Sequence, residues 1–162
     1  MGRVRTQVAT DRARGELEKV YREEGARLQR SLLLFSGDRD VADDAVAEAF
    51  AQALRRGNEL RSPKAWVWRA AFRIAAGELK RRRGTTRPAG DGAYEDPEPA
   101  ADPVAALRKL SPAQRSAIIL HHYAGYPAGE VAGIIGSTAP AVFVHLSRGR
   151  RRLRELLEVT DD

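Results

Sequence analysis

Apolar residues recur three or four positions apart along most of the chain, which is the spacing of one face of an α-helix and predicts an all-α protein. Three helices are expected in the first half of the chain. The first covers 17–35, the second covers 41–56 with Asp40 as its cap, and the third covers 63–83 and ends in a basic run.

The second half of the chain, 110–157, has the pattern of a helix-turn-helix. Ser111 can cap a first helix, and Gln114 can reach back to close a capping box. A second, short helix over 128–135 ends at Gly136, which can take the positive φ that stops a helix. The long helix that follows has a basic outer face, as expected for a helix that enters a DNA major groove. The alternative at this point is an ordinary helical hairpin with solvated arginines.

Composition narrows the function classes. The 162 residues include 28 Lys and Arg against 22 Asp and Glu, a net charge of +6, so a polyanionic partner is expected. The absence of cysteine and the presence of only three histidines leave little for metal chemistry, and no metal or cofactor is expected. No apolar run approaches the ~20 residues needed to cross a bilayer, and no signal-peptide pattern is present, so a cytoplasmic protein without membrane insertion is expected. No carboxylate pair, nucleophile or phosphate-binding loop stands out, so the chain is expected to be neither an enzyme nor a binder of a small-molecule substrate.

Changes in composition divide the chain into four parts. Residues 1–14 are polar and basic and are expected to form a disordered tail. Residues 15–83 and 104–162 are expected to form two small helical domains. Between them, 84–103 is rich in Gly, Pro and acidic residues and is expected to be a flexible linker. An extended run of this length reaches roughly 60 Å, more than the ~34 Å of one turn of B-DNA, so the two domains could contact separate patches of one DNA.

Two surfaces of the first domain are candidates for binding. Asp44 and Glu48 lie four residues apart and form an acidic strip, which is either a solvated surface or a docking face for a basic partner. The third helix interleaves Trp66 and Trp68 with cations. Rings beside cations are suited to single-stranded nucleic acid, because rings stack on unpaired bases and cations hold phosphates; the alternative is that these rings belong to the core.

Taken together, the two halves resemble the extracytoplasmic-function sigma factors of bacterial RNA polymerase. The stretch "GDRDVADDAVAEAF" is similar to the core-binding helix of that family, and "SPKAWVWRAAFRIAAGELKRRR" is similar to its promoter-melting helix. The stretch "LSPAQRSAIILHHYAGYPAGEVAGIIG" is similar to its −35 domain. The resemblance implies a three-helix sigma-2-like bundle and a helix-turn-helix sigma-4-like domain. It also implies the partners: the clamp and flap regions of the RNA polymerase core, promoter DNA, and an anti-sigma factor.

The resemblance also assigns roles to residues of this sequence. Core binding falls to Asp43, Asp44, Ala47 and Glu48. Recognition and melting of the −10 element fall to Asn58, Arg61, Ser62, Trp66, Trp68, Arg69, Arg73, Lys80, Arg81 and Arg82, with a flipped base held in the 58–62 loop. Recognition of the −35 element falls to Thr138, Phe143, Val144, His145, Ser147, Arg148, Arg150 and Arg151, with Arg148 expected to contact a base edge.

Several positions depart from the family pattern. Ala47 replaces a common Gln, and Arg73 and Gly77 replace an Asn and an Asp of the melting helix. The segment 141–145 lacks two cations that usually enter the major groove, so the strength and preference of −35 reading are open. Two alternatives therefore remain: a stand-alone helix-turn-helix regulator that binds a palindrome as a dimer, and a sigma-like adaptor with reduced promoter reading, which residues 143–145 favour.

Overall fold

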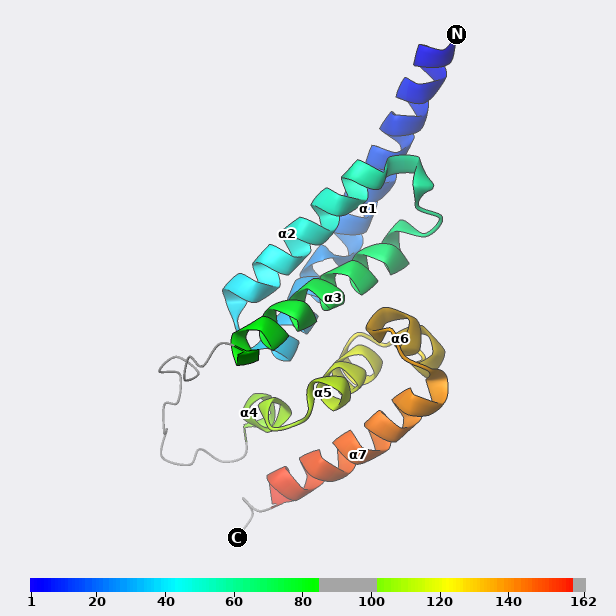
Figure 1. Ribbon diagram of the computed structural model, residues 1–162. Helices are drawn as coiled ribbons and strands as arrows, with labels where there is room; N and C mark the ends of the chain where they lie inside the picture. The colour runs from blue at the N-terminus through cyan, green and yellow to red at the C-terminus, as the bar shows by residue number, and fades with distance from the viewer. Residues whose placement is uncertain (85–101, 159–162) are drawn as a thin grey trace.

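A computed structural model describes residues 1–84 and 102–158 of the chain, and these residues form an all-α structure, as the sequence predicts (Figure 1). The elements are α1 (Gly2–Ser36), α2 (Arg39–Arg56), the 3₁₀ turn η1 (Gly57–Glu59), α3 (Pro63–Gly84), α4 (Pro103–Arg108), α5 (Pro112–Ile118), the π-helical turn η2 (Ile119–Tyr123), α6 (Ala128–Ile135) and α7 (Ala139–Glu158). Helices α1 to α3 form one helical body and α4 to α7 a second. The predicted linker over 84–103 lies almost entirely outside the described residues.

A three-helix bundle forms because α1, α2 and α3 each bury one apolar stripe. Leu28 and Leu32 of α1 and Trp68 of α3 are fully buried. Helix α2 contributes mostly alanines to this core, including Ala45 and Ala49, which are almost fully buried. Small side chains let the neighbouring helices approach closely, so the bundle packs tightly around a few large side chains.

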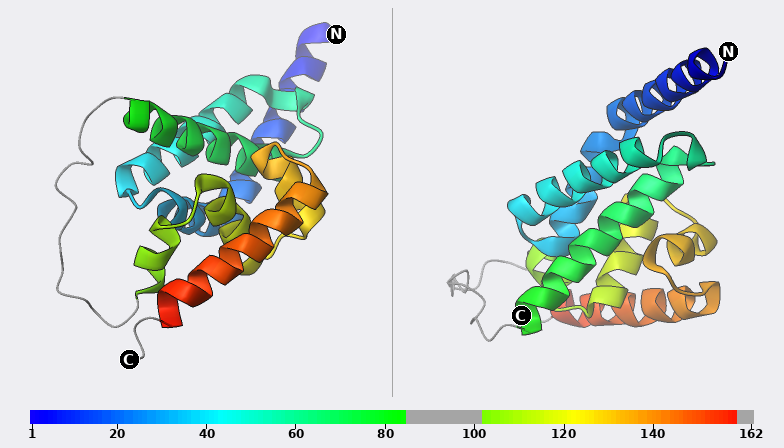
Figure 2. Two further views of the ribbon diagram at one scale, coloured as in Figure 1. Left: turned by 60° about the horizontal axis from the view of Figure 1, so that its bottom comes forward. Right: turned by 45° about the horizontal axis from the view of Figure 1, so that its top comes forward.

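The prediction of a disordered tail over 1–14 is wrong, because α1 begins at Gly2. The N-terminal turns of α1 protrude from the bundle with the α2–α3 loop on one side of them (Figures 1 and 2), and Val8 is 62% exposed there. The segment has no proline and is rich in good helix formers such as Arg, Gln and Ala. Once the bundle has nucleated the helix, propagation along such a sequence costs little. The sequence prediction failed because it required an apolar face for helix formation.

The start of α2 also differs from the prediction. Its cap is Asp38 rather than Asp40, and the Asp38 carboxylate accepts a hydrogen bond from the Val41 N–H at 3.1 Å. The same carboxylate pairs with Arg82 at the end of α3 at 2.9 Å. The cap therefore also ties the start of α2 to the basic end of α3.

The local signals in the second half are confirmed. Ser111 and Gln114 form both hydrogen bonds of a capping box at the start of α5. Gly136 ends α6 with φ of 68°, and the Ala141 N–H at the start of α7 donates to the Thr138 hydroxyl at 3.3 Å. These signals are correct because each depends on only a few adjacent residues.

The two halves pack against each other. Helix α6 lies beside α3, and the segment around η2 and α4 contacts α1 (Figures 1 and 2). No single helix among the described residues is long and apolar enough to cross a membrane; only α6 and α7 taken together, with a 99° bend between them, reach that length and composition.

Candidate nucleic-acid interface

Helices α6 and α7 form the helix-turn-helix. Val142 and Leu146 of α7 are buried against the rest of the domain, and Gly149 lies against α5. A Cβ added to Gly149 would come 3.0 Å from the Ile118 side chain, so glycine at this position allows the close approach of α7 to α5 without a shift of Ile118. Helices α5 and α6 separate α7 from the three-helix bundle (Figure 1), which leaves the opposite face of α7 open.

That open face carries most of the predicted −35 residues. Phe143 and Val144 are 60% and 44% exposed. The other exposed predicted residues are Thr138, Ser147, Arg148, Arg150 and Arg151. His145 is the exception, because it is partly buried and lines a hollow of about 350 Å³ between α7, α5 and α3. His145 is therefore not available on the open face of α7 in this arrangement.

The Arg150 guanidinium lies 3.4 Å from Nε2 of His122. Burial, together with the nearby His121 and Arg150, lowers the pKa of His122 below its usual value. The imidazole is thus kept neutral near pH 7, which leaves it able to accept the hydrogen bond from Arg150 and to aim that cation from α7.

The predicted −10 side chains gather at the start of α3 and in the preceding loop. Arg61, Ser62 and Arg69 line a hollow of about 650 Å³ together with Trp66. Arg56 stacks its guanidinium over the Trp66 ring, 5.4 Å from the centroid, so Trp66 is a partly exposed ring flanked by cations. Tyr126 and Glu130 of the second half form the opposite wall of this hollow.

The basic end of α3 is partly neutralised within the protein. Lys80, Arg81 and Arg82 are exposed, but Arg81 pairs with Glu78, and Arg82 pairs with both Glu78 and Asp38. Hydrogen bonds with Asp38 and Glu78 raise the pKa of Arg82, and the Arg82 hydrogen bond lowers the pKa of Asp38. The end of α3 is therefore less positive than the run of arginines in the sequence indicates.

Trp68 does not lie on this surface. Its ring is fully buried, stacked 6.2 Å from the Phe72 ring and edge-on to the Tyr126 ring at 5.1 Å. The prediction that Trp68 lines a path for a DNA strand is therefore wrong for this arrangement, and the core alternative holds. The reason is helical spacing, since position 68 falls on the same buried stripe as Phe72 while Trp66 lies beside it.

The contact between the halves is built from side chains that the sequence interpretation did not select. Arg27 of α1 donates a hydrogen bond to the Ala124 carbonyl at 2.8 Å, and its guanidinium lies over the rings of Trp68 and Tyr126. Glu24 pairs with Arg27 at 2.6 Å and with Lys64 at 3.1 Å. We call Glu24, Arg27, Lys64, Trp68 and Tyr126 the interdomain cluster.

The acidic strip of α2 faces away from this contact. Asp43, Asp44, Ala47 and Glu48 are all exposed. Asp43 pairs with Arg39 at 3.7 Å, and Glu48 pairs with Arg55 at 3.1 Å. Among the described residues, Asp44 makes no ion pair and no side-chain hydrogen bond. The strip is thus an accessible anionic surface with one carboxylate left for a partner.

Comparisons with known proteins agree with this geometry. Residues 104–153 match the family model described as Sigma-70, region 4. The chain is 26% identical over 157 residues to the ECF RNA polymerase sigma factor SigE of Mycolicibacterium smegmatis, which covers 86% of this chain and 61% of SigE. It is 29% identical over 154 residues to SigM of Mycobacterium tuberculosis, covering 86% of this chain and 76% of SigM.

Among solved structures, the fold is similar to that of the sigma factor RpoE from Bartonella quintana in complex with the anti-sigma factor NepR. The TM-score is 0.68 at 26% identity, and the match covers 90% of this chain and 96% of RpoE. Over both halves, the chain is similar to extracytoplasmic-function sigma factors.

One signal for the interdomain cluster was present in the sequence. Glu24 lies four residues before Leu28 on the apolar face of the first helix, where a charged residue is unusual without a partner. Burial raises the pKa of Glu24, but hydrogen bonds and charges from Arg27 and Lys64 outweigh that effect and lower the pKa below its usual value of 4.5. Tyr126 carried no such signal, because its position depends on the π-helical turn η2.

Proposed function

We propose that this chain binds the core of RNA polymerase and directs transcription from specific promoters. The main support is the helix-turn-helix of α6 and α7, whose exposed cationic face occurs in a segment that matches sigma-70 region 4. The likeness to RpoE over both halves supports the same role for the chain as a whole. In this proposal, the exposed acidic strip of α2 docks on the polymerase.

In this proposal, α7 binds the −35 major groove. Arg148 contacts a base edge, and Arg150 and Arg151 contact phosphates. Phe143 and Val144 offer apolar contacts to thymine methyl groups, in place of the cations common in the family. The −10 element is opened by the first half, where Trp66 stacks on an unpaired base.

The packing of the halves has a consequence for this role. The hollow that holds Arg61, Trp66 and Arg69 is closed on one side by Tyr126 and Glu130. Separation of the two halves would remove this wall and open these side chains more fully to a DNA strand. We infer that docking on the polymerase separates the halves, and that an anti-sigma factor keeps the protein inactive by retaining them together.

The proposal is tested with core polymerase of Mycolicibacterium smegmatis and a DNA library with a randomised promoter region. Run-off transcription followed by sequencing of the transcribed templates is expected to enrich one two-part promoter in the presence of the protein. Labelled promoter is then incubated with the protein alone, with core alone and with both, and only the mixture is expected to give a retarded band. Arg148→Ala is expected to lower transcription from this promoter and to relax its −35 preference.

The other functions predict different results in the same assay. A band with the protein alone would indicate a stand-alone helix-turn-helix regulator. Binding to the core without any enriched promoter would indicate a sigma-like adaptor, for which the exposed Phe143 and Val144 would supply a protein-binding surface. No binding to the core would reject the proposed function.

A further inference from the structure

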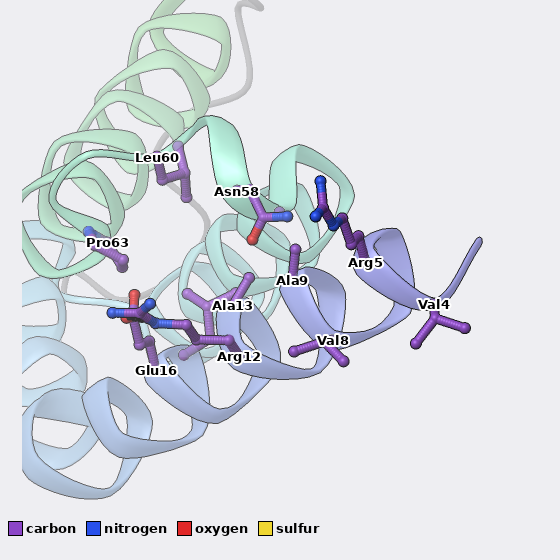
Figure 3. A pocket seen from close by; sticks show the side chains of 12 residues that line it. Val4, Arg5, Val8, Ala9, Arg12, Ala13, Glu16, Asn58, Leu60 and Pro63 are labelled. Carbon is purple, nitrogen blue, oxygen red and sulfur yellow. Dashed lines mark ion pairs between the residues drawn. The ribbon is translucent and has the colours of Figure 1, made fainter. Parts of the chain in front are cut away.

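The first four turns of α1, residues 2–16, form one wall of a groove of about 520 Å³ (Figure 3). We call this segment the α1 arm. The other wall is the loop that joins α2 to α3, and it contributes Asn58, Leu60 and Pro63. Leu60 also lines the hollow that holds Arg61 and Trp66, so the groove adjoins the site at which the proposed function places the unpaired base of the −10 element.

The α1 arm supplies the chemistry that a single strand of DNA needs. Over 2–14 it has four arginines and one aspartate. Arg5 and Arg12 line the groove, and the Arg5 side chain points toward Asn58 (Figure 3). Val8 is 62% exposed and lies between these cations, where it gives a base an apolar surface. Single-strand binding sites combine a positively charged groove along the backbone with side chains that contact the bases, usually aromatic rings. In the α1 arm, the arginines supply the charge, and Val8 supplies an aliphatic contact in place of a ring.

The cations of the groove are available to a ligand. Arg12 is paired with Glu16 at 3.6 Å, and both side chains are largely solvated. An exposed pair of this kind contributes about 0.3–0.5 kcal/mol, so a phosphate can displace the carboxylate at little cost. Val4 and Val8 are 70% and 62% exposed, so these valines contribute little burial to the bundle.

We propose that the α1 arm binds the melted non-template strand next to the unpaired base, with Arg5 and Arg12 on its phosphates and Val8 against a base. This inference rests on the proposed function, because it needs the strand that a sigma factor would open. It assigns a DNA-binding role to a segment that the sequence alone indicates to be a disordered tail.

The first test identifies the occupant of the groove directly. The chain has no cysteine, so Val8→Cys provides a single site for a photo-crosslinker, and Arg14→Cys provides a control on the same helix outside the groove. Each labelled protein is assembled with core polymerase on the enriched promoter and irradiated. A crosslink from position 8 to the non-template strand, absent from position 14, is the expected result. A crosslink to a polymerase subunit, or none, would overturn the inference.

The second test measures the contribution of the cations. Arg5→Glu with Arg12→Glu is compared with Arg3→Glu with Arg14→Glu, which makes the same change of charge on residues that do not line the groove. The control is also matched in its helical neighbours, because an acidic residue follows both Arg12 and Arg14 by four positions. The groove variant is expected to lower open-complex formation at least tenfold more than the control variant, and circular dichroism checks that α1 stays helical.

The design separates this inference from the proposed function. If the wild-type protein forms no transcribing holoenzyme, the proposed function fails. If the wild-type protein transcribes and both charge variants behave alike, the α1 arm inference alone fails. Premelted promoter DNA, unpaired over the −10 region, is expected to retain the difference between the two variants, because the inferred contact is to the single strand and not to the melting step.

Discussion

The contact between the two halves depends strongly on Tyr126, and replacing this residue by alanine is expected to separate them. The Tyr126 ring is half-buried, stands edge-on to the buried Trp68 ring, and receives the cations of Arg27 and Lys64 at 5.7 Å and 5.9 Å. Tyr126 lies in the turn that follows η2 and is not part of the core of its own domain. Its removal therefore affects the interdomain contact more than the fold of either half.

The magnitude follows from the buried area and the ring contacts. A fully buried aromatic side chain covers about 150–250 Å², so half of a tyrosine buries about 100 Å², worth about 2.5 kcal/mol at about 25 cal/mol per Å². The edge-on ring pair adds about 1 kcal/mol. Part of the buried area of Tyr126 faces its own domain and does not change when the halves separate. About 2–3 kcal/mol is therefore assigned to the interdomain contact. The equilibrium between packed and separated halves is then expected to shift by about 30- to 150-fold.

The assay is a distance measurement between spin labels at Leu54→Cys on α2 and Arg151→Cys on α7, two exposed positions in a chain that has no other cysteine. Tyr126→Ala is expected to replace a narrow distance distribution with a broad one at longer distances. Tyr123→Ala is the control, because Tyr123 is 46% exposed and lies three residues earlier. An unchanged distribution for Tyr126→Ala, with its helical content intact, would refute the assignment of the contact energy.

Three further predictions concern the interdomain cluster, the packing of α7 and the acidic strip. Glu24→Gln is expected to lower the free energy of unfolding by about 1–3 kcal/mol at pH 7, since it removes two charge-assisted hydrogen bonds. Because the folded pKa of Glu24 is depressed, the stability it contributes is present above pH 4.5 and is lost as the pH falls through the folded pKa, so thermal melts of variant and wild type should converge in acid. Gly149→Ala is expected to lower the melting temperature, as overpacking costs about 1–3 kcal/mol against about 1 kcal/mol of helix propensity; the exposed Gly133→Ala should instead raise it. Charge reversal at Asp44 and Glu48 together is expected to weaken binding to core polymerase at least tenfold without changing the melting temperature, and unchanged affinity in a titration would reject the docking face.

Local signals predicted much of this fold because they depend on adjacent residues. The capping box at Ser111 and the end of α6 at Gly136 each follow from a few positions, and the structure confirms them. Helical spacing likewise predicts the buried face of α7, including Val142 and Leu146. The cap of α2 was misplaced by two residues, because Asp38 and Asp40 are equally suited by type and only the surrounding backbone decides between them.

The rest depends on contacts between residues far apart in the sequence. No pattern along the chain indicates that Arg27 hydrogen-bonds to a carbonyl 97 residues later, or that Tyr126 covers the Trp68 ring. The same contacts decide the exposure of Trp68 and His145 in this arrangement: Trp68 is buried, and His145 lies in the hollow between the halves. Whether a side chain is exposed depends on tertiary packing. The sequence reveals only the residue type, so it could not separate DNA-contacting side chains from buried ones.

The energies explain why the polymerase, and not DNA, is expected to separate the halves. Non-specific binding of DNA, with a Kd of about 10⁻⁴–10⁻⁶ M, corresponds to only about 5–8 kcal/mol. A ligand can shift a conformational equilibrium only by its differential affinity for the two states. If separation of the halves costs a few kcal/mol, this cost is subtracted from the binding free energy of DNA. Each 1.4 kcal/mol then weakens the apparent affinity for DNA tenfold. A partner with nanomolar affinity has a binding free energy of about 12 kcal/mol. It therefore still binds tightly after the free energy of separating the halves is subtracted. The acidic strip of α2 lies outside the interdomain contact and is open to such a partner in the closed arrangement. Docking can therefore precede opening, and exposure of the −10 side chains then follows from the assembly of the holoenzyme.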